Sequence, residues 1–268
     1  MSYKIRYYGV SHMGLCRKVN QDNLICEKTI LPCRHHGTGD MLTGIVSPGR
    51  ETVFGVFDGM GGEEKGEVAA YIAAEHMRTF CQWAKDGSDL TAFCREANEA
   101  ICQYTKDHAL TSMGTTAVLI KFDIKGIWLC NIGDSKAYVM SGQKFEQISQ
   151  DHVWMPELYP KPPLSQNLGI PEDELLIEPY IAPLDYRDQD IYLLCSDGLS
   201  DMVSTDHMKE ILTSRAGPEA ARTLLEEALD HGGKDNITFL LLYVMKDEKE
   251  SFFKKLLKRG SDRSCLTD

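Results

Sequence analysis

Basic residues are scarce in this sequence. Its 268 residues include 29 lysines and arginines against 40 aspartates and glutamates, a formal net charge of −11 at pH 7. Nonspecific binding to nucleic acid requires a basic surface that displaces counterions, so we expect no nucleic-acid partner. The surplus carboxylates are instead available to hold metal ions.

Long hydrophobic runs are also absent. The longest, 239–245, is far shorter than the roughly 20 residues of a membrane-spanning helix, and residues 1–6 lack the apolar core of a secretory signal. The nine cysteines form no C-x-x-C pair, and their odd number fits neither a disulfide framework nor a zinc ribbon. We therefore expect a cytoplasmic protein in a reducing compartment, without stable membrane insertion.

Short runs rich in β-branched and aromatic residues predict strands. They lie at 52–57, 115–122, 127–132, 136–140, 190–195 and 237–245. The second and third runs are joined by Asp123-Ile124-Lys125-Gly126, and the third and fourth by Gly133-Asp134-Ser135. Such links are too short for a crossover helix, so we expect two antiparallel hairpins.

Apolar residues at helical spacing predict two long helices after the first strand, over 69–84 and 90–104, and a third over 218–232. Hairpin-rich sheets with helices outside indicate an α+β layered domain rather than a parallel doubly wound one. Two segments are predicted to be long loops, which in a compact domain are usually functional or mobile. Residues 31–51 contain glycines, prolines and few apolar residues, and residues 154–188 are rich in proline and show little periodicity.

Four aspartates stand beside predicted strands. Asp58, Asp134 and Asp197 each follow a strand and adjoin a glycine, and Asp235 precedes the last strand. Carboxylates that converge at a sheet edge repel one another unless a cation neutralises them. Oxygen ligands without histidine or cysteine suit Mg²⁺ or Mn²⁺ rather than zinc. A single Asp-Gly pair is also typical of an ordinary turn, but the four together favour a metal site.

Seven stretches of the chain carry a family resemblance. They are RKVNQDN (17–23), VFDGMGG (56–62), MGTT (113–116), NIGDSKAY (131–138), SQDH (149–152), CSDGLSD (195–201) and GKDNIT (233–238). In this order the sequence resembles the PP2C (PPM) family of metal-dependent protein serine/threonine phosphatases, especially its compact bacterial members. Each stretch alone is a weak signal, whereas seven in order are specific.

The resemblance implies an α-β-β-α sandwich, in which two antiparallel sheets are flanked by helices. Residues 1–245 would form this single domain, and 246–268 a short charged C-terminal tail that either docks on the domain or contacts a membrane or partner. The implied reaction is hydrolysis of phosphoserine and phosphothreonine in proteins by water activated at a dinuclear Mn²⁺ or Mg²⁺ centre. The implied partners are a protein kinase or its phosphorylated targets, and we expect a monomer.

The resemblance also assigns roles to individual residues. Asp58 would bridge two metal ions, the Gly59 carbonyl would bind one of them, and Asp197 and Asp235 would complete the shell of the other. Asp22 would support the centre through water, Asp134 and Asp201 would hold a third, weaker ion, and Arg17 would bind the substrate phosphate. From the sequence alone, a solvated surface charge is the less favoured alternative for Arg17.

Several positions depart from the family pattern. Gln21 replaces a glutamate, which removes a negative charge beside Asp22, and Met60 stands where animal relatives carry a histidine proposed as general acid. Lys136 replaces the common arginine. The segment 153–169 is short and proline-rich, so we predict a reduced or irregular flap there.

Histidines give weaker signals. We expect His152 to make a structural hydrogen bond rather than act as general acid. Cys33, His35 and His36 lack a fourth partner at useful spacing, so we predict an exposed loop and no zinc site.

Two other functions share this sequence pattern. A pseudophosphatase that only binds partners is disfavoured because Asp58, Asp197 and Asp235 are all present. A phosphatase that acts on a regulator of sigma factors would use the same chemistry on another substrate.

Overall fold

The computed structural model describes residues 2–49, 52–60, 65–80, 89–155, 157–159 and 161–247. Three features expected from the sequence lie outside these residues: positions 248–268 of the tail, the glycines at 61 and 62, and the end of the first predicted helix beyond residue 80.

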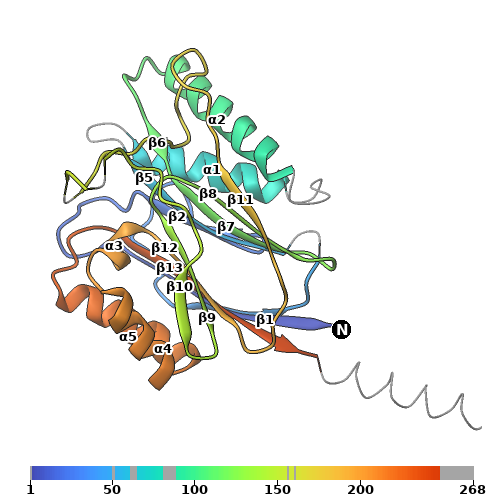
Figure 1. Cartoon of the computed structure of the whole chain (residues 1–268). Helices are drawn as coiled ribbons and strands as arrows, with labels where there is room; N and C mark the ends of the chain where they lie inside the picture. Colours follow the sequence, from blue (N-terminus) through green and yellow to red (C-terminus); the bar gives the residue numbers. More distant parts are fainter. Residues whose placement is uncertain are drawn as a thin grey trace, which may run out of the picture.

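Two antiparallel sheets form the centre of the molecule (Figure 1). The first runs, in spatial order, through β10 (Lys144–Gln147), β9 (Lys136–Ser141), β12 (Ile191–Cys195), β13 (Ile237–Lys246), β1 (Tyr3–His12) and β4 (Leu42–Val46). The second runs through β11 (Tyr180–Leu184), β8 (Ile127–Ile132), β7 (Ala117–Phe122), β5 (Val53–Met60), β2 (Asp22–Cys26) and β3 (Thr29–Ile30), with β6 (Gly114–Thr115) paired to β5.

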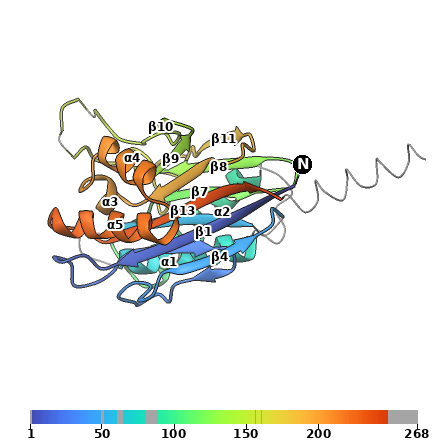
Figure 2. The same cartoon turned by 90° about the horizontal axis from the view of Figure 1, so that it is seen from below.

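Helices cover the outer faces of both sheets (Figures 1 and 2). The helices α1 (Gly66–Phe80) and α2 (Asp89–Asp107) pack on the second sheet, while α3 (Asp197–Ser200), α4 (Thr205–Ser214) and α5 (Gly217–Asp230) lie on the first. Three clusters of buried apolar side chains fill the interfaces between these layers. The α-β-β-α sandwich is therefore confirmed. Among the described residues, no helix has the length and apolar character needed to cross a membrane.

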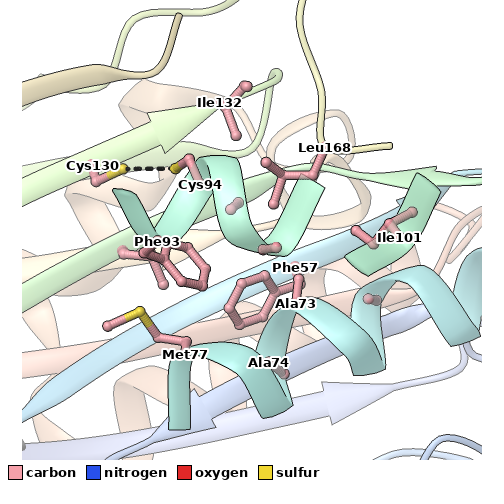
Figure 3. Close-up of a cluster of buried hydrophobic side chains, with 14 of the residues drawn as sticks. Phe57, Ala73, Ala74, Met77, Phe93, Cys94, Ile101, Cys130, Ile132 and Leu168 are labelled. Atoms are coloured by element: carbon pink, nitrogen blue, oxygen red, sulfur yellow. Dashed lines mark hydrogen bonds between the residues drawn. The ribbon is translucent and has the colours of Figure 1, made fainter. Parts of the chain in front are cut away.

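Small side chains bring α1 close to the second sheet. Ala73 and Ala74 face the sheet from α1, and Met77, Phe57 and Phe93 fill the space between α1, α2 and β5 (Figure 3). Because burial of each large apolar side chain contributes about 1.5–3 kcal/mol, this interface fixes β5 firmly.

Strand alternation on β5 sets the direction of its aspartate. Phe57 points outward into the cluster with α1 and α2, whereas Phe54 and Val56 point inward, between the sheets. Side chains of successive strand residues point to opposite faces, so Asp58 continues the inward face. Asp22 lies directly opposite Asp58 on β2, at the same open end of the sandwich.

One predicted hairpin is wrong. The strands β7 and β8 do pair as antiparallel neighbours, but β8 and β9 belong to different sheets, with β8 bonded to β7 and β11 and β9 to β12 and β10. Packed sheets lie about 10 Å apart, and three extended residues span about that distance. The link Gly133-Asp134-Ser135 therefore crosses the sandwich, with Gly133 at a φ of +100°.

The two predicted long loops contain strands. The strand β4 lies within 31–51 and β11 within 154–188. The strands β1 and β2 and the helices α3 and α4 were also not predicted. The strand β1 mixes tyrosine, lysine, arginine and histidine with few aliphatic residues, so it lacks the apolar run that marks its neighbour β13.

Candidate active site

Aspartates from both sheets meet in one cavity of about 850 Å³. Asp58 comes from β5 in the second sheet, Asp197 begins α3 after β12, and Asp235 precedes β13 in the first sheet. Asp134 lies in the link that crosses between the sheets. Arg17, Gln21, Gly59, Met60, Thr116 and Lys161 also line the cavity. The four aspartates predicted from their places beside strands are thus brought together.

Two other predicted site residues do not line the cavity. Asp22 lies behind it, only 2 % exposed, and its Oδ2 accepts a hydrogen bond of 2.8 Å from Ser196 Oγ. Asp201 lies just after α3 and is half exposed. Its carboxylate is 3.7 Å from Lys161 Nζ, which places it at the edge of the site rather than inside it.

The carboxylates raise one another's pKa values. Burial raises the pKa of Asp58 well above its ordinary value, and the charges of Asp197, Asp22, Asp134 and Asp235 add to the shift. Burial, followed by the Asp197 charge, raises the pKa of Asp134 to about 6. Burial raises the pKa of Asp22 to about 7, although hydrogen bonds from Thr238 and Ser196 oppose the shift. This mutual repulsion is what a bound cation would relieve.

The donor chemistry fits hard divalent ions. The described residues that line the cavity include four aspartates and no histidine or cysteine, and an oxygen-ligand set of this kind suits Mg²⁺ or Mn²⁺. Within the described part of the chain, no three acidic, histidine or cysteine side chains already surround one ion position. Two of the carboxylates, Asp235 and Asp197, also contact a cationic side chain, each through its Oδ2.

Those two contacts involve one predicted and one unpredicted residue. Arg17 Nη2 donates to Asp235 Oδ2 at 2.6 Å, with about half of the arginine side chain exposed. Lys161 Nζ donates to Asp197 Oδ2 at 2.5 Å. Burial lowers the pKa of Lys161, but the hydrogen bond to Asp197 and the charges of Asp197, Asp201 and Asp235 outweigh it and raise the pKa overall.

Comparison with known proteins decides the family. Residues 48–245 match the family model described as stage II sporulation protein E (SpoIIE). The serine/threonine phosphatase Stp of Listeria monocytogenes is 31 % identical over 212 residues, which cover 70 % of this chain and 82 % of that protein. The chain belongs to the SpoIIE/PP2C-type serine/threonine phosphatases.

Solved structures agree with this family assignment. The Mycobacterium tuberculosis phosphatase PstP superposes with a TM-score of 0.74 at 27 % identity, covering 90 % of this chain and all of that structure. The catalytic domain of PstP solved with two manganese ions superposes with a TM-score of 0.73 at 28 % identity, covering 91 % of this chain and all of that one.

The small polar residues of the family stretches build the scaffold of this phosphatase site. Asn236 Oδ1 accepts from the Gln21 N–H at 2.8 Å, while its Nδ2 donates to the carbonyls of Met13 and Val19 at 2.9 and 3.0 Å. These bonds hold the segment that carries Arg17 against Asp235. The sequence does not reveal this role of Asn236, because its partners lie more than 200 residues away along the chain.

A second scaffold supports the Asp58 backbone. Thr116 Oγ1 accepts from the Asp58 N–H at 3.1 Å and lies 2.6 Å from Ser135 Oγ. The Asp58 carbonyl accepts from Thr115 Oγ1 at 3.0 Å. The crossing link and β5 are thereby joined next to the cavity.

The glycines beside the aspartates allow close backbone approach. A Cβ at Gly59 would lie 2.2 Å from the carbonyl oxygen of Gly66 and 2.4 Å from that of Gln21. A Cβ at Gly198 would lie 1.9 Å from the Asn236 carbonyl oxygen. These Asp-Gly pairs are therefore not ordinary turns, because the glycine lets a neighbouring segment pack beside each aspartate.

The structural role predicted for His152 is confirmed. The ring Nδ1 of His152 accepts from the backbone N–H of Gly133 at 3.2 Å. The backbone N–H of His152 donates to the Gly133 carbonyl at 3.0 Å. Burial lowers its pKa, which keeps the ring neutral as an acceptor. The described residues of the flap segment 153–169 contain no helix, in agreement with the predicted irregular flap.

The exposed loop predicted around His35 needs correction. His35 is half-buried, and its Nε2–H donates to the Asp22 carbonyl at 2.9 Å. Cys33 is also half-buried, with its Sγ 3.8 Å from the Glu67 carbonyl oxygen. His35 therefore braces the strand that carries Asp22, and Cys33 contacts the first turn of α1. His36 is exposed as expected.

Proposed function

We propose that this phosphatase hydrolyses phosphoserine and phosphothreonine in proteins at a dinuclear Mn²⁺ or Mg²⁺ centre and opposes a protein kinase. The observation that carries the proposal is the convergence of Asp58, Asp197 and Asp235 with Arg17 in one cavity. The manganese ions in the related PstP structure support the choice of metal. We further propose that the chain acts as a monomer on phosphorylated kinases or their targets.

Each carboxylate has a role in holding the ions. Asp58 would bridge them, since the charges of Asp22, Asp134, Asp197 and Asp235 all raise its pKa. The Gly59 carbonyl would add a ligand to one ion, and Asp197 and Asp235 would bind the other. When bound, two such ions supply hydroxide near neutral pH and neutralise the charge on the phosphoryl oxygens.

The remaining residues orient the phosphate and the ligands. Arg17 would leave Asp235 and hold the phosphate, because a guanidinium can donate two parallel hydrogen bonds to phosphoryl oxygens. Asp22 would hold Ser196, and through it the start of α3, beside the centre. Met60 lines the cavity and has no proton to donate, so the leaving alkoxide would take its proton from water.

The test is hydrolysis of a phosphothreonine peptide with added Mn²⁺ or Mg²⁺ and with excess EDTA. We expect release of phosphate only with added metal. Full turnover in EDTA would contradict the dinuclear centre, and no turnover with either metal would favour a pseudophosphatase.

A further inference from the structure

A lysine of the flap reaches into the acidic site. Lys161 Nζ lies 2.5 Å from Asp197 Oδ2 and 3.7 Å from Asp201 Oδ2. Asp201 and Asp134 are the residues that the family resemblance links to a third, weaker metal ion. The ammonium group thus contacts one of those two residues and a carboxylate of the main cavity at once.

The flap backbone holds Lys161 in this position. Val153 bridges to Leu164, the Trp154 N–H donates to the Pro163 carbonyl at 2.8 Å, and the Ser165 N–H donates to the His152 carbonyl at 2.9 Å. Lys161 lies two residues before Pro163, where this short ladder ends, and Pro162 and Pro163 restrict φ there. Through His152, the ladder is fastened to Gly133, next to Asp134.

The charge of Lys161 acts on both carboxylates that it contacts. At 2.5 Å from Asp197 Oδ2 and 3.7 Å from Asp201 Oδ2, one positive charge offsets part of the repulsion between the two carboxylates. That is the electrostatic effect of a weakly held cation.

We propose that the Lys161 ammonium, through its contacts with Asp197 and Asp201, is a tethered cation that takes the place of the third divalent ion that the resemblance assigns to Asp134 and Asp201. The proposal rests on the dinuclear centre proposed above. The contact uses Oδ2 of Asp197 and leaves Oδ1 for that centre. Since a tethered charge needs no free ion, the third position is filled at any metal concentration.

The test is the number of Mn²⁺ ions bound by the full chain, measured by calorimetric titration and by electron paramagnetic resonance of the unbound ion. We expect the wild-type chain to bind two ions. Lys161→Gln should gain a third, weaker site at least about tenfold tighter than any further binding to the wild type, because one unit of positive charge is removed. Lys161→Arg keeps the cation and should gain none.

Two further variants make the assignment specific. Lys125→Gln removes an exposed lysine in the turn between β7 and β8 and should still bind two ions. Asp201→Asn in the Lys161→Gln background should abolish the third site, because it removes one of its ligands.

Each other result has a distinct meaning. If the wild-type chain binds no pair of ions, the dinuclear centre itself is wrong. If it binds two and Lys161→Gln also binds two, the tethered cation is refuted, whether or not the KM for a phosphopeptide rises. Equal tightening of both original sites in Lys161→Gln would also refute it, since the lysine would then compete with the main centre.

Discussion

At the level of single residues, the site combines aspartates that stand beside strands with one lysine from the flap. Asp58, Asp134 and Asp197 stand beside glycine at the ends of apolar runs, and this local pattern is visible in the sequence without the fold. Lys161 lies in a proline-rich segment without any such pattern. Its partner Asp197 is 36 residues away, so only the folded chain brings the two together.

Asp58→Asn tests the residue assigned the bridging role. We expect turnover of a phosphothreonine peptide at saturating Mn²⁺ to fall by at least about a hundredfold, because the change removes the charge shared by both ions. Asp230→Asn, at the exposed end of α5, is the matched control and should keep wild-type turnover. A near-normal rate for Asp58→Asn would show that another residue bridges the ions.

Gln21→Glu tests the departure from the family pattern. Gln21 lines the cavity with Asp58, so a carboxylate there should strengthen the attraction for one ion. We expect a lower Mn²⁺ concentration at half-maximal activity. An unchanged or higher value would mean that the added charge does not reach the centre or only increases the repulsion among the carboxylates.

At the level of elements, the link after β8 shows where local reasoning stops. A three-residue connection can close a hairpin or cross between two packed sheets, and its length does not distinguish the two. The crossing matters because it places Asp134 between the sheets, facing Asp58 from β5 and Asp197 from α3. The strands themselves were predicted well where their apolar runs are continuous, as in β7, β8 and β13.

Gly133→Ala tests the crossing. Gly133 has a φ of +100°, and a Cβ there would lie 2.6 Å from Thr116 Cγ2. We expect the free energy of unfolding in urea to fall by roughly 1–3 kcal/mol, since strain and a collision add. Gly142→Ala is the control, because it also has a positive φ of 61° but no atom within 4 Å of the added Cβ. Equal losses for the two variants would contradict the tight crossing.

At the level of the whole molecule, the layers follow from the distribution of apolar side chains. The strand β7 is buried along its whole length, as its continuous apolar run predicted, and the helices α1, α2 and α5 cover the sheets with the faces that their periodicity indicates. The pairing order within each sheet was not predictable, because β1 and β4 give weak local signals and pair with distant segments.

The carboxylates at the open end of the sandwich should make stability depend on pH. The pKa values of Asp22 and Asp134 are raised to about 7 and about 6 in the folded chain. The folded state then holds more protons than the unfolded state between about pH 4 and 7, so stability falls as the pH rises through that window. Because Asp22 and Asp134 lose these protons as the pH rises, we expect the Tm in EDTA to be lower at pH 8 than at pH 5.5.

Divalent ions should reverse that trend, because they bind the ionised carboxylates. The increase in Tm on addition of Mn²⁺ should be larger at pH 8 than at pH 5.5. The same increase at both values would indicate that the ions bind away from these aspartates.

Anomalous diffraction at the manganese edge, from crystals of the wild-type chain grown with Mn²⁺, would locate the bound ions. We expect two peaks at the open end of the sandwich, bridged by the Asp58 carboxylate, with the Gly59 carbonyl on one ion and Asp197 and Asp235 on the other. A single peak, or peaks that Asp58 does not bridge, would contradict the dinuclear centre.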